Sequence, residues 1–195
     1  MPILLASANL GKIREIKAIL ADSGLDLLSI IDTDDLAKFG IKIPADFEVL
    51  ETGQTFRENA LLKARAYAQL SNLPCIADDS GLEVEALSGF PSVYSNRWFD
   101  GSAEERNLAL LEKMQKQQNR QARFRTVICF FNPQLEEAKF FNGEIKGRIA
   151  SRCRGKKEEG FGYDPIFIPE GYEQSFAELG NKVKNEISHR RQALL

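Results

Sequence analysis

The sequence predicts an α/β fold in which a mixed β-sheet is flanked by helices. Short apolar stretches typical of buried strands alternate along the chain with stretches whose apolar residues recur at helical spacing. Three Ser/Thr-x-x-Glu capping boxes mark helix starts among these stretches. The 195 residues, 43% of them hydrophobic, suffice for one sizeable core. We therefore expect residues 1–195 to form a single domain.

The first expected elements are a strand over residues 3–6 and a helix over residues 12–21, joined by a tight loop. Isoleucine and leucine recur on one side of this helix, and Gly24 stops it. The capping boxes that begin at Thr55, Ser102 and Ser175 predict one helix to about residue 71, a second to about residue 117, and a third, shorter one.

The remaining strands follow from apolar runs. Residues 73–77 predict a short buried strand that ends immediately before Asp78 and Asp79. Residues 125–131 and 138–149 predict an antiparallel pair joined through Asn132-Pro133, so the sheet should be mixed. The polar residues 115–121 belong to a helix end or an exposed loop.

The charge is nearly balanced. A net charge of −2 gives no global basic field that would favour nucleic acid or a membrane as partner. Positive charge is concentrated in two local clusters, which form either solvated faces or a pocket for a polyanion smaller than a nucleic acid. Their members are Lys146, Arg148, Arg152, Arg154, Lys156 and Lys157, then Lys182, Lys184, His189, Arg190 and Arg191.

The cysteines and the N-terminus indicate a cytoplasmic protein. Cys75, Cys129 and Cys153 are odd in number and widely spaced, which predicts neither a disulfide framework nor a zinc knuckle. The N-terminus lacks the pattern of a signal peptide, and no apolar run approaches the ~20 residues of a membrane span.

Asp78 and Asp79 are the first candidates for chemistry. Adjacent carboxylates at the end of a buried strand suit a hard cation such as Mg²⁺, which shares its other positions with water and substrate phosphates. The alternative is an Asp/Ser/Gly turn that only ends a strand.

The loop of residues 7–12 is a candidate phosphate site. It joins a strand to a helix, so free backbone N–H groups and the positive end of the helix dipole converge near Asn9 and Gly11. It is not a Walker A loop, because Ala6 and Ile13 replace the required Gly and Ser/Thr. An ordinary Asn N-cap explains the same residues.

The helix after Thr55 directs a lysine toward the core. At about 100° per residue, Lys63 lies about 20° from the apolar face that begins with Phe56. An inward ammonium needs an anionic partner, such as Asp79 or Glu51. The alternative is a lysine that snorkels along apolar surface.

The segment of residues 160–165 combines two aromatic side chains with two glycines and a carboxylate next to a rigid proline. Aromatic faces stack on nucleobases, and glycine lets a ligand approach the backbone closely. A turn anchored in the core by Phe161 and Tyr163 would look similar. His189 is the only histidine, and beside Arg190 it offers hydrogen-bond donors.

Five segments together resemble the Ham1/RdgB family of inosine/xanthosine triphosphate pyrophosphatases. They are Ser-Ala-Asn-Leu-Gly-Lys at 7–12, Glu-Thr-Gly-x-Thr-Phe-x-Glu-Asn-Ala-x-x-Lys-Ala at 51–64, Ala-Asp-Asp-Ser-Gly-Leu-x-Val at 77–84, Phe-Gly-Tyr-Asp-Pro at 161–165 and Ile-Ser-His-Arg at 187–190. The resemblance implies a two-lobed α/β protein around a long mixed sheet, usually a homodimer, with the nucleotide between the lobes. It also implies Mg²⁺-dependent hydrolysis of non-canonical purine triphosphates (ITP, dITP, XTP) to the monophosphate and pyrophosphate.

The resemblance assigns roles by position. Glu51 and Asp79 would hold Mg²⁺, Asp79 would also act as the base, and Lys63 would be catalytic. The substrate-binding residues would be Ser7, Ala8, Asn9, Leu10, Gly11, Lys12, Ser80, Phe161, Gly162, Tyr163, Asp164, Lys184, His189 and Arg190.

Three positions depart from the family pattern. Ser92 replaces a usual Gly and would be strained if φ is positive there. Asn96 replaces a usual Ala, and the chain stops at Leu195, early in what is commonly a longer final helix. Two alternative functions stay open: a Maf-like pyrophosphatase of modified pyrimidine nucleotides and a non-catalytic nucleotide sensor.

Overall fold

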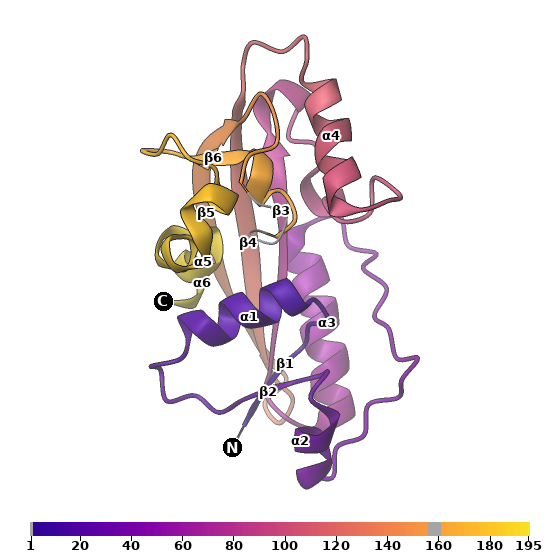
Figure 1. Ribbon diagram of the computed structural model, residues 1–195. Coiled ribbons are helices and arrows are strands. Elements are labelled where there is room, and N and C mark those ends of the chain that lie inside the picture. The colour runs from indigo at the N-terminus through magenta and orange to yellow at the C-terminus, as the bar shows by residue number, and fades with distance from the viewer. Residues whose placement is uncertain (1, 156–160) are drawn as a thin grey trace. The chain divides into compact units, whose positions relative to one another are not determined.

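The computed structural model describes residues 2–155 and 161–195 and has the expected α/β character. Lys156 and Lys157 of the first basic cluster, and Gly160 of the 160–165 segment, lie outside the described residues. Six strands form one sheet in the order β2-β1-β3-β4-β5-β6 (Figure 1). Strand β1 (Ile3–Leu5) pairs in parallel with β2 (Leu27–Ser29) and β3 (Cys75–Val84), whereas β5 (Glu137–Ile149) and β6 (Phe167–Pro169) are antiparallel. The prediction of a mixed sheet is therefore confirmed.

The chain divides into two compact units. Unit 1 contains residues 1–79, 126–142 and 193–195, and unit 2 contains residues 80–125 and 143–192. Three strands run from one unit into the other: β3, β5 and β4 (Gln121–Asn132). No helix among the described residues combines the length and the apolar character of a membrane span.

In unit 1, the sheet lies between two helices because successive side chains of a strand point to opposite faces. One buried cluster joins α3 (Phe56–Ser71) to Leu4, Cys75, Ala77 and Cys129. A second cluster joins α1 (Leu10–Ile19) to the neighbouring strand residues that point to the other face of the sheet, Leu5, Ile76 and Ile128. The short helix α2 (Thr33–Lys38) was not predicted, nor was β2, and α2 adds Leu36 to the first cluster.

Unit 2 has one core, in which aromatic side chains are prominent. Phe124 of β4 packs against Phe167 at a centroid distance of 4.6 Å, and Phe167 stacks on Phe176 at 5.4 Å. Leu110 and Met114 add the buried side of α4 (Ala103–Lys113). The last helices are α5 (Phe176–Ile187) and α6 (His189–Leu194), and three short 3₁₀ turns cover Glu85–Leu87, Ser92–Tyr94 and Asp164–Ile166.

The three predicted capping boxes are confirmed. In each, the Ser or Thr hydroxyl accepts from the backbone N–H of the Glu three residues later, and the Glu carboxylate accepts from the cap N–H. Helix α4 ends at Lys113, earlier than predicted, because the polar residues after the buried Met114 have no apolar side to bury. Gly180 interrupts α5 with φ 75° and ψ 169°, so each helical part is short.

The predicted end of the strand at residue 77 is wrong. Strand β3 continues through both aspartates to Val84, and Leu82 and Val84 are fully buried. The two carboxylates do not break the strand because each reaches a lysine that projects from a helix. These contacts join the candidate site residues of unit 1.

Candidate active site

The loop after β1 is organised by Asn9. Its side-chain oxygen accepts from the backbone N–H groups of Gly11 (3.0 Å) and Lys12 (3.2 Å), and the backbone N–H of Asn9 donates to Ser7 Oγ (3.2 Å). The N-cap interpretation is therefore confirmed. The phosphate-binding role of residues 7–12 stays a prediction; of these residues, Ala8 and Leu10 are exposed.

Lys12 projects from the first turn of α1 and pairs with Asp78. Lys12 Nζ lies 3.2 Å from Asp78 Oδ1, and both side chains are buried. Asp78 lies two residues after Ile76 in β3, so its side chain points to the same face of the sheet as Ile76, which is the α1 side. The alternation of side chains along β3 thus explains why Asp78 pairs with Lys12 of α1.

Asp79 lies two residues after Ala77, so its side chain points to the face of the sheet opposite that of Asp78, the α3 side. Its Oδ1 lies 3.4 Å from Lys63 Nζ, and its Oδ2 accepts from Asn59 Nδ2 at 3.2 Å. Lys63 also donates to Glu51 Oε1 at 2.5 Å. One ammonium is therefore shared by two carboxylates from separate segments, which confirms the predicted inward direction of Lys63 and its predicted partners.

The pKa values of this group reflect burial and charge. Burial raises the pKa of the Asp79 carboxyl above its ordinary value, although Lys63 and Lys12 oppose this effect. Burial by itself would lower the pKa of Lys63, but the combined field of Asp79, Asp78 and Glu51 outweighs burial and raises it. The ammonium is thus held in its charged form by the same carboxylates that it neutralises.

Glu51 and Asp79 fit the chemistry of a magnesium site. Both offer hard oxygen donors that already converge on one cation, Lys63 Nζ. Within residues 2–155 and 161–195, no three His, Cys, Asp or Glu side chains are grouped as a metal site of protein ligands alone would require. Mg²⁺ does not require such a group, because one or two carboxylates suffice when phosphate and water supply the other ligands.

Sequence reasoning assigned no role to two further residues of this group. Asn59 is fully buried and bonds to Asp79. Thr126 of β4 donates through Oγ1 to the Asp79 carbonyl at 3.2 Å. Asn59 precedes Lys63 by four residues on one helix, and this spacing could have placed both on one side of it. No local signal identifies Thr126, because its contact depends on which strand lies beside β3.

Unit 2 contains the other predicted site residues. Lys184 Nζ and the backbone N–H of Phe161 both donate to Asp164 Oδ2, at 2.6 and 2.7 Å. Lys184 also lies 5.7 Å from the centroid of the Phe161 ring. Phe161 itself is half-buried, so its ring is partly accessible.

Tyr163 is part of the core and does not present an open face. Only 4% of it is exposed; its hydroxyl donates to the Ser95 carbonyl at 2.6 Å and accepts from Trp98 Nε1 at 2.6 Å. Burial raises the pKa of Tyr163 to about 12. The core-anchor interpretation therefore describes Tyr163. Gly162, beside it, has φ 62°, which favours glycine there.

The Ser-His-Arg segment is buried in unit 2. The His189 ring stacks on Phe124 at a centroid distance of 4.9 Å and an interplanar angle of 13°. Arg190 is 2% exposed, and its guanidinium donates to Ser80 Oγ at 3.1 Å. Asp164, Lys184, His189 and Arg190 are thus a set of buried polar side chains, and their role in substrate binding stays a prediction.

Comparisons with known proteins show which family this chain resembles in sequence and fold. A model of the Ham1 family matches residues 3–195. A dITP/XTP pyrophosphatase of Aquifex aeolicus is 42% identical over 205 residues, which cover 100% of this chain and 93% of the relative. Another, from Thermus thermophilus, is 43% identical, with 100% of this chain and 88% of the relative covered.

Solved structures of Ham1 proteins are also similar. The Staphylococcus aureus protein is 40% identical with a TM-score of 0.81, and the Coxiella burnetii protein is 37% identical with a TM-score of 0.82. Each comparison covers 100% of this chain and 94% of the other chain.

Proposed function

This chain belongs to the Ham1 family, and on that premise we propose that it hydrolyses non-canonical purine nucleoside triphosphates to the monophosphate and pyrophosphate. ITP, dITP and XTP are the substrates proposed. The observation that carries the proposal is the position of Lys63 between Glu51 and Asp79. A protein that only bound nucleotides would have no need to keep two carboxylates and an ammonium together in this way.

In the proposed mechanism, the residues of unit 1 bind and activate the triphosphate. Glu51 and Asp79 would hold Mg²⁺, which when bound supplies positive charge against the phosphate oxygens. Lys12 and Lys63 would donate to phosphate oxygens, so that charge developing in the transition state meets preorganised ammonium groups. The residues of the 7–11 loop would add backbone contacts.

Asp79 would orient the attacking water and accept its proton. Burial raises the pKa of the Asp79 carboxyl, and positive charge held at the site would oppose this effect and keep the carboxylate ionised at neutral pH, because opposite charge lowers the pKa of a carboxyl. Asn59 and Thr126 hold the side chain and the carbonyl of Asp79 respectively, so the orientation of the carboxylate is fixed from both ends. A base held in this way contributes typically about 10²–10⁴-fold to the rate.

Selection of the base would depend on donors in unit 2. Hypoxanthine and xanthine carry a carbonyl acceptor at C6, where adenine carries an amino donor. Lys184, His189 or Arg190 would donate a hydrogen bond to this carbonyl, but would face another donor in adenine. Sites that make such bonds discriminate by up to about 10⁴–10⁵-fold. Phe161 would add stacking.

The test is a substrate panel with identified products. The protein is incubated with Mg²⁺ and ITP, dITP, XTP, GTP, ATP or pyrimidine triphosphates, and phosphorus NMR distinguishes pyrophosphate from orthophosphate. We expect pyrophosphate from ITP, dITP and XTP, and loss of this activity in Glu51→Gln. Glu48→Gln, three residues away and exposed, is the matched control. Orthophosphate with inosine diphosphate as products would contradict the proposal.

Two further properties are proposed from the family. The protein is a homodimer, which light scattering on the purified chain would test, and it acts in the cytoplasm.

A further inference from the structure

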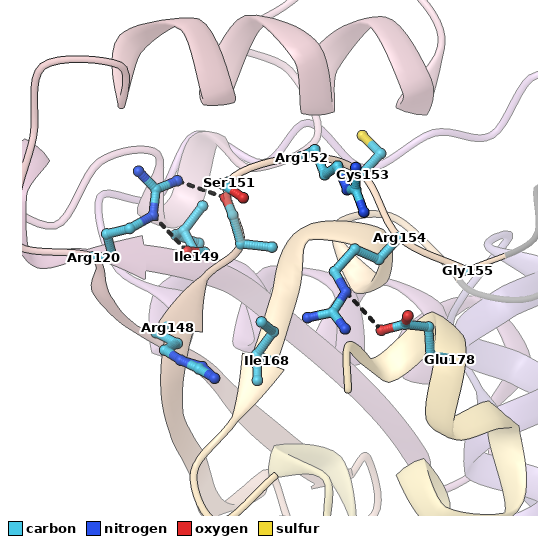
Figure 2. A pocket seen from close by; sticks show the side chains of 11 residues that line it. Arg120, Arg148, Ile149, Ser151, Arg152, Cys153, Arg154, Gly155, Ile168 and Glu178 are labelled. Atoms are coloured by element: carbon cyan, nitrogen blue, oxygen red, sulfur yellow. Dashed lines mark hydrogen bonds and ion pairs between the residues drawn. The ribbon is translucent and has the colours of Figure 1, made fainter. Parts of the chain in front are cut away.

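A second polar pocket lies entirely in unit 2. Its volume is about 740 Å³, which is within the range of small-molecule sites. Among the described residues that line it are four arginines and one carboxylate, Glu178 (Figure 2). Three of the arginines belong to the basic cluster of the sequence, and none has a part in the proposed hydrolysis. The four are Arg120, Arg148, Arg152 and Arg154.

Arg120 forms a rigid, positively charged wall. Its Nε donates to the Ile149 carbonyl and one terminal nitrogen donates to the Ala150 carbonyl, both at 2.6 Å. The other terminal nitrogen donates to the Met114 carbonyl at 3.4 Å. In the part of the chain that the structure describes, these partners are all neutral, and burial lowers the pKa of Arg120. The charge of Arg120 is therefore oriented but not neutralised by a carboxylate.

Arg148 and Arg154 are each paired with an acidic side chain. Arg148 pairs with Glu173 at 2.6 Å, and Arg154 pairs with Glu178 at 3.0 Å. Figure 2 shows these two arginine side chains on either side of Ile168. The Glu173 side chain is 91% exposed, so water screens this pair strongly.

Arg152 is exposed, and among residues 2–155 and 161–195 its side chain has no ion pair or hydrogen bond. Among the described lining residues, four arginines and Glu178 leave an excess of positive charge, which Glu173 reduces by its pair with Arg148. Guanidinium groups match phosphate oxygens in bidentate geometry, and several around one cavity favour a ligand with several phosphate oxygens.

We propose that this pocket binds a compact polyanion with two or three linked phosphates, separately from the candidate active site. The ligand is either free pyrophosphate or tripolyphosphate, or the phosphate chain of a nucleotide. The inference does not depend on the proposed hydrolysis, because every lining residue belongs to unit 2 and none has a role in the proposed mechanism.

Calorimetric titration in chelator tests the proposal, because binding is then measured without added metal. Pyrophosphate, tripolyphosphate and ATP are titrated into the wild-type protein and into Arg152→Glu. We expect one binding event to weaken by about tenfold or more in the variant, since it loses a charged hydrogen-bond donor and gains a repulsive charge. The kcat/KM for ITP with Mg²⁺ should stay at the wild-type value.

Lys139→Glu is the matched control, because it makes the same charge change at an exposed residue of unit 1. It should bind all three probes as the wild type does. Equal losses for tripolyphosphate and ATP would identify the phosphates alone as the ligand, and a larger loss for ATP would identify a nucleotide. Wild-type affinity and stoichiometry in Arg152→Glu for every probe would overturn the proposal, as would equal losses in Lys139→Glu.

Discussion

Asn59 links Asp79 to the segment that carries Glu51. Its Nδ2 donates to Asp79 Oδ2 at 3.2 Å, while its Oδ1 accepts from the Gly53 N–H at 2.8 Å. Gly53 has no room for a side chain, since an added Cβ would lie 2.6 Å from Asn59 Oδ1. The orientation of one proposed metal ligand and the course of the chain near the other are thus coupled through one buried amide.

Asn59→Ala should therefore lower activity without removing a group that touches the substrate. Loss of such an outer partner typically costs about 10–100-fold in metal affinity or activity. We expect kcat to fall and the Mg²⁺ concentration for half-maximal rate to rise, with a smaller change in the KM for ITP. A metal titration of the steady-state rate measures both. An unchanged Mg²⁺ dependence in a folded variant would show that Asn59 only fills space.

Lys63→Met should reduce kcat by about 10²–10³-fold, the usual cost of one preorganised electrostatic group. Methionine keeps the apolar stem along α3 but removes the ammonium that Glu51 and Asp79 share. The control is Lys38→Met, because Lys38 pairs with Asp35 at 2.7 Å on the surface. Circular dichroism verifies the fold of each variant. Wild-type kcat in Lys63→Met would show that the ion pairs of Lys63 are structural and not catalytic.

Ser92→Gly should stabilise the protein. Ser92 has φ 49°, which confirms the condition under which the sequence predicted strain. The left-handed conformation costs a residue with a Cβ roughly 1–2 kcal/mol, and glycine gives back about 0.5–1 kcal/mol in unfolded-state entropy. The net gain in the free energy of unfolding should lie between about 0 and 1.5 kcal/mol by urea titration. A decrease would mean that the weak contact of Ser92 Oγ with Glu83 at 3.5 Å matters more than the strain.

Local sequence patterns predicted the elements whose signals are local. Capping boxes marked the starts of α3, α4 and α5, and helical spacing directed Lys63 inward. Strand β3 was cut short in the prediction because two adjacent aspartates are typical of a turn, and only partners on two different helices make them tolerable in a strand. The roles of Thr126 and Phe124 depend on long-range contacts, which no local pattern reports.

Asp79→Asn should raise the stability of the metal-free protein at neutral pH. The folded-state pKa of Asp79 is raised above 3.8 even with Lys63 and Lys12 nearby. As pH rises past 3.8, this carboxyl ionises in the unfolded chain before it does so in the folded protein, and the free energy of unfolding falls. The fall is complete, and remains, once pH exceeds the folded pKa. The advantage of Asn should thus be absent at acid pH and increase toward neutral pH. Urea titrations in chelator at several pH values measure it.

The same variant should lose activity. Asn keeps the shape and the hydrogen-bonding capacity of Asp79, but it cannot accept the proton of water, so the rate should fall by about 10²–10⁴-fold while ITP still binds. Asp78→Asn is the matched comparison, because the neighbouring carboxylate pairs with Lys12 on the α1 side and has no role as base in the proposed mechanism. Its loss of activity should be smaller. If Asp78→Asn is the more damaging change in a stable protein, the roles of the two carboxylates are reversed.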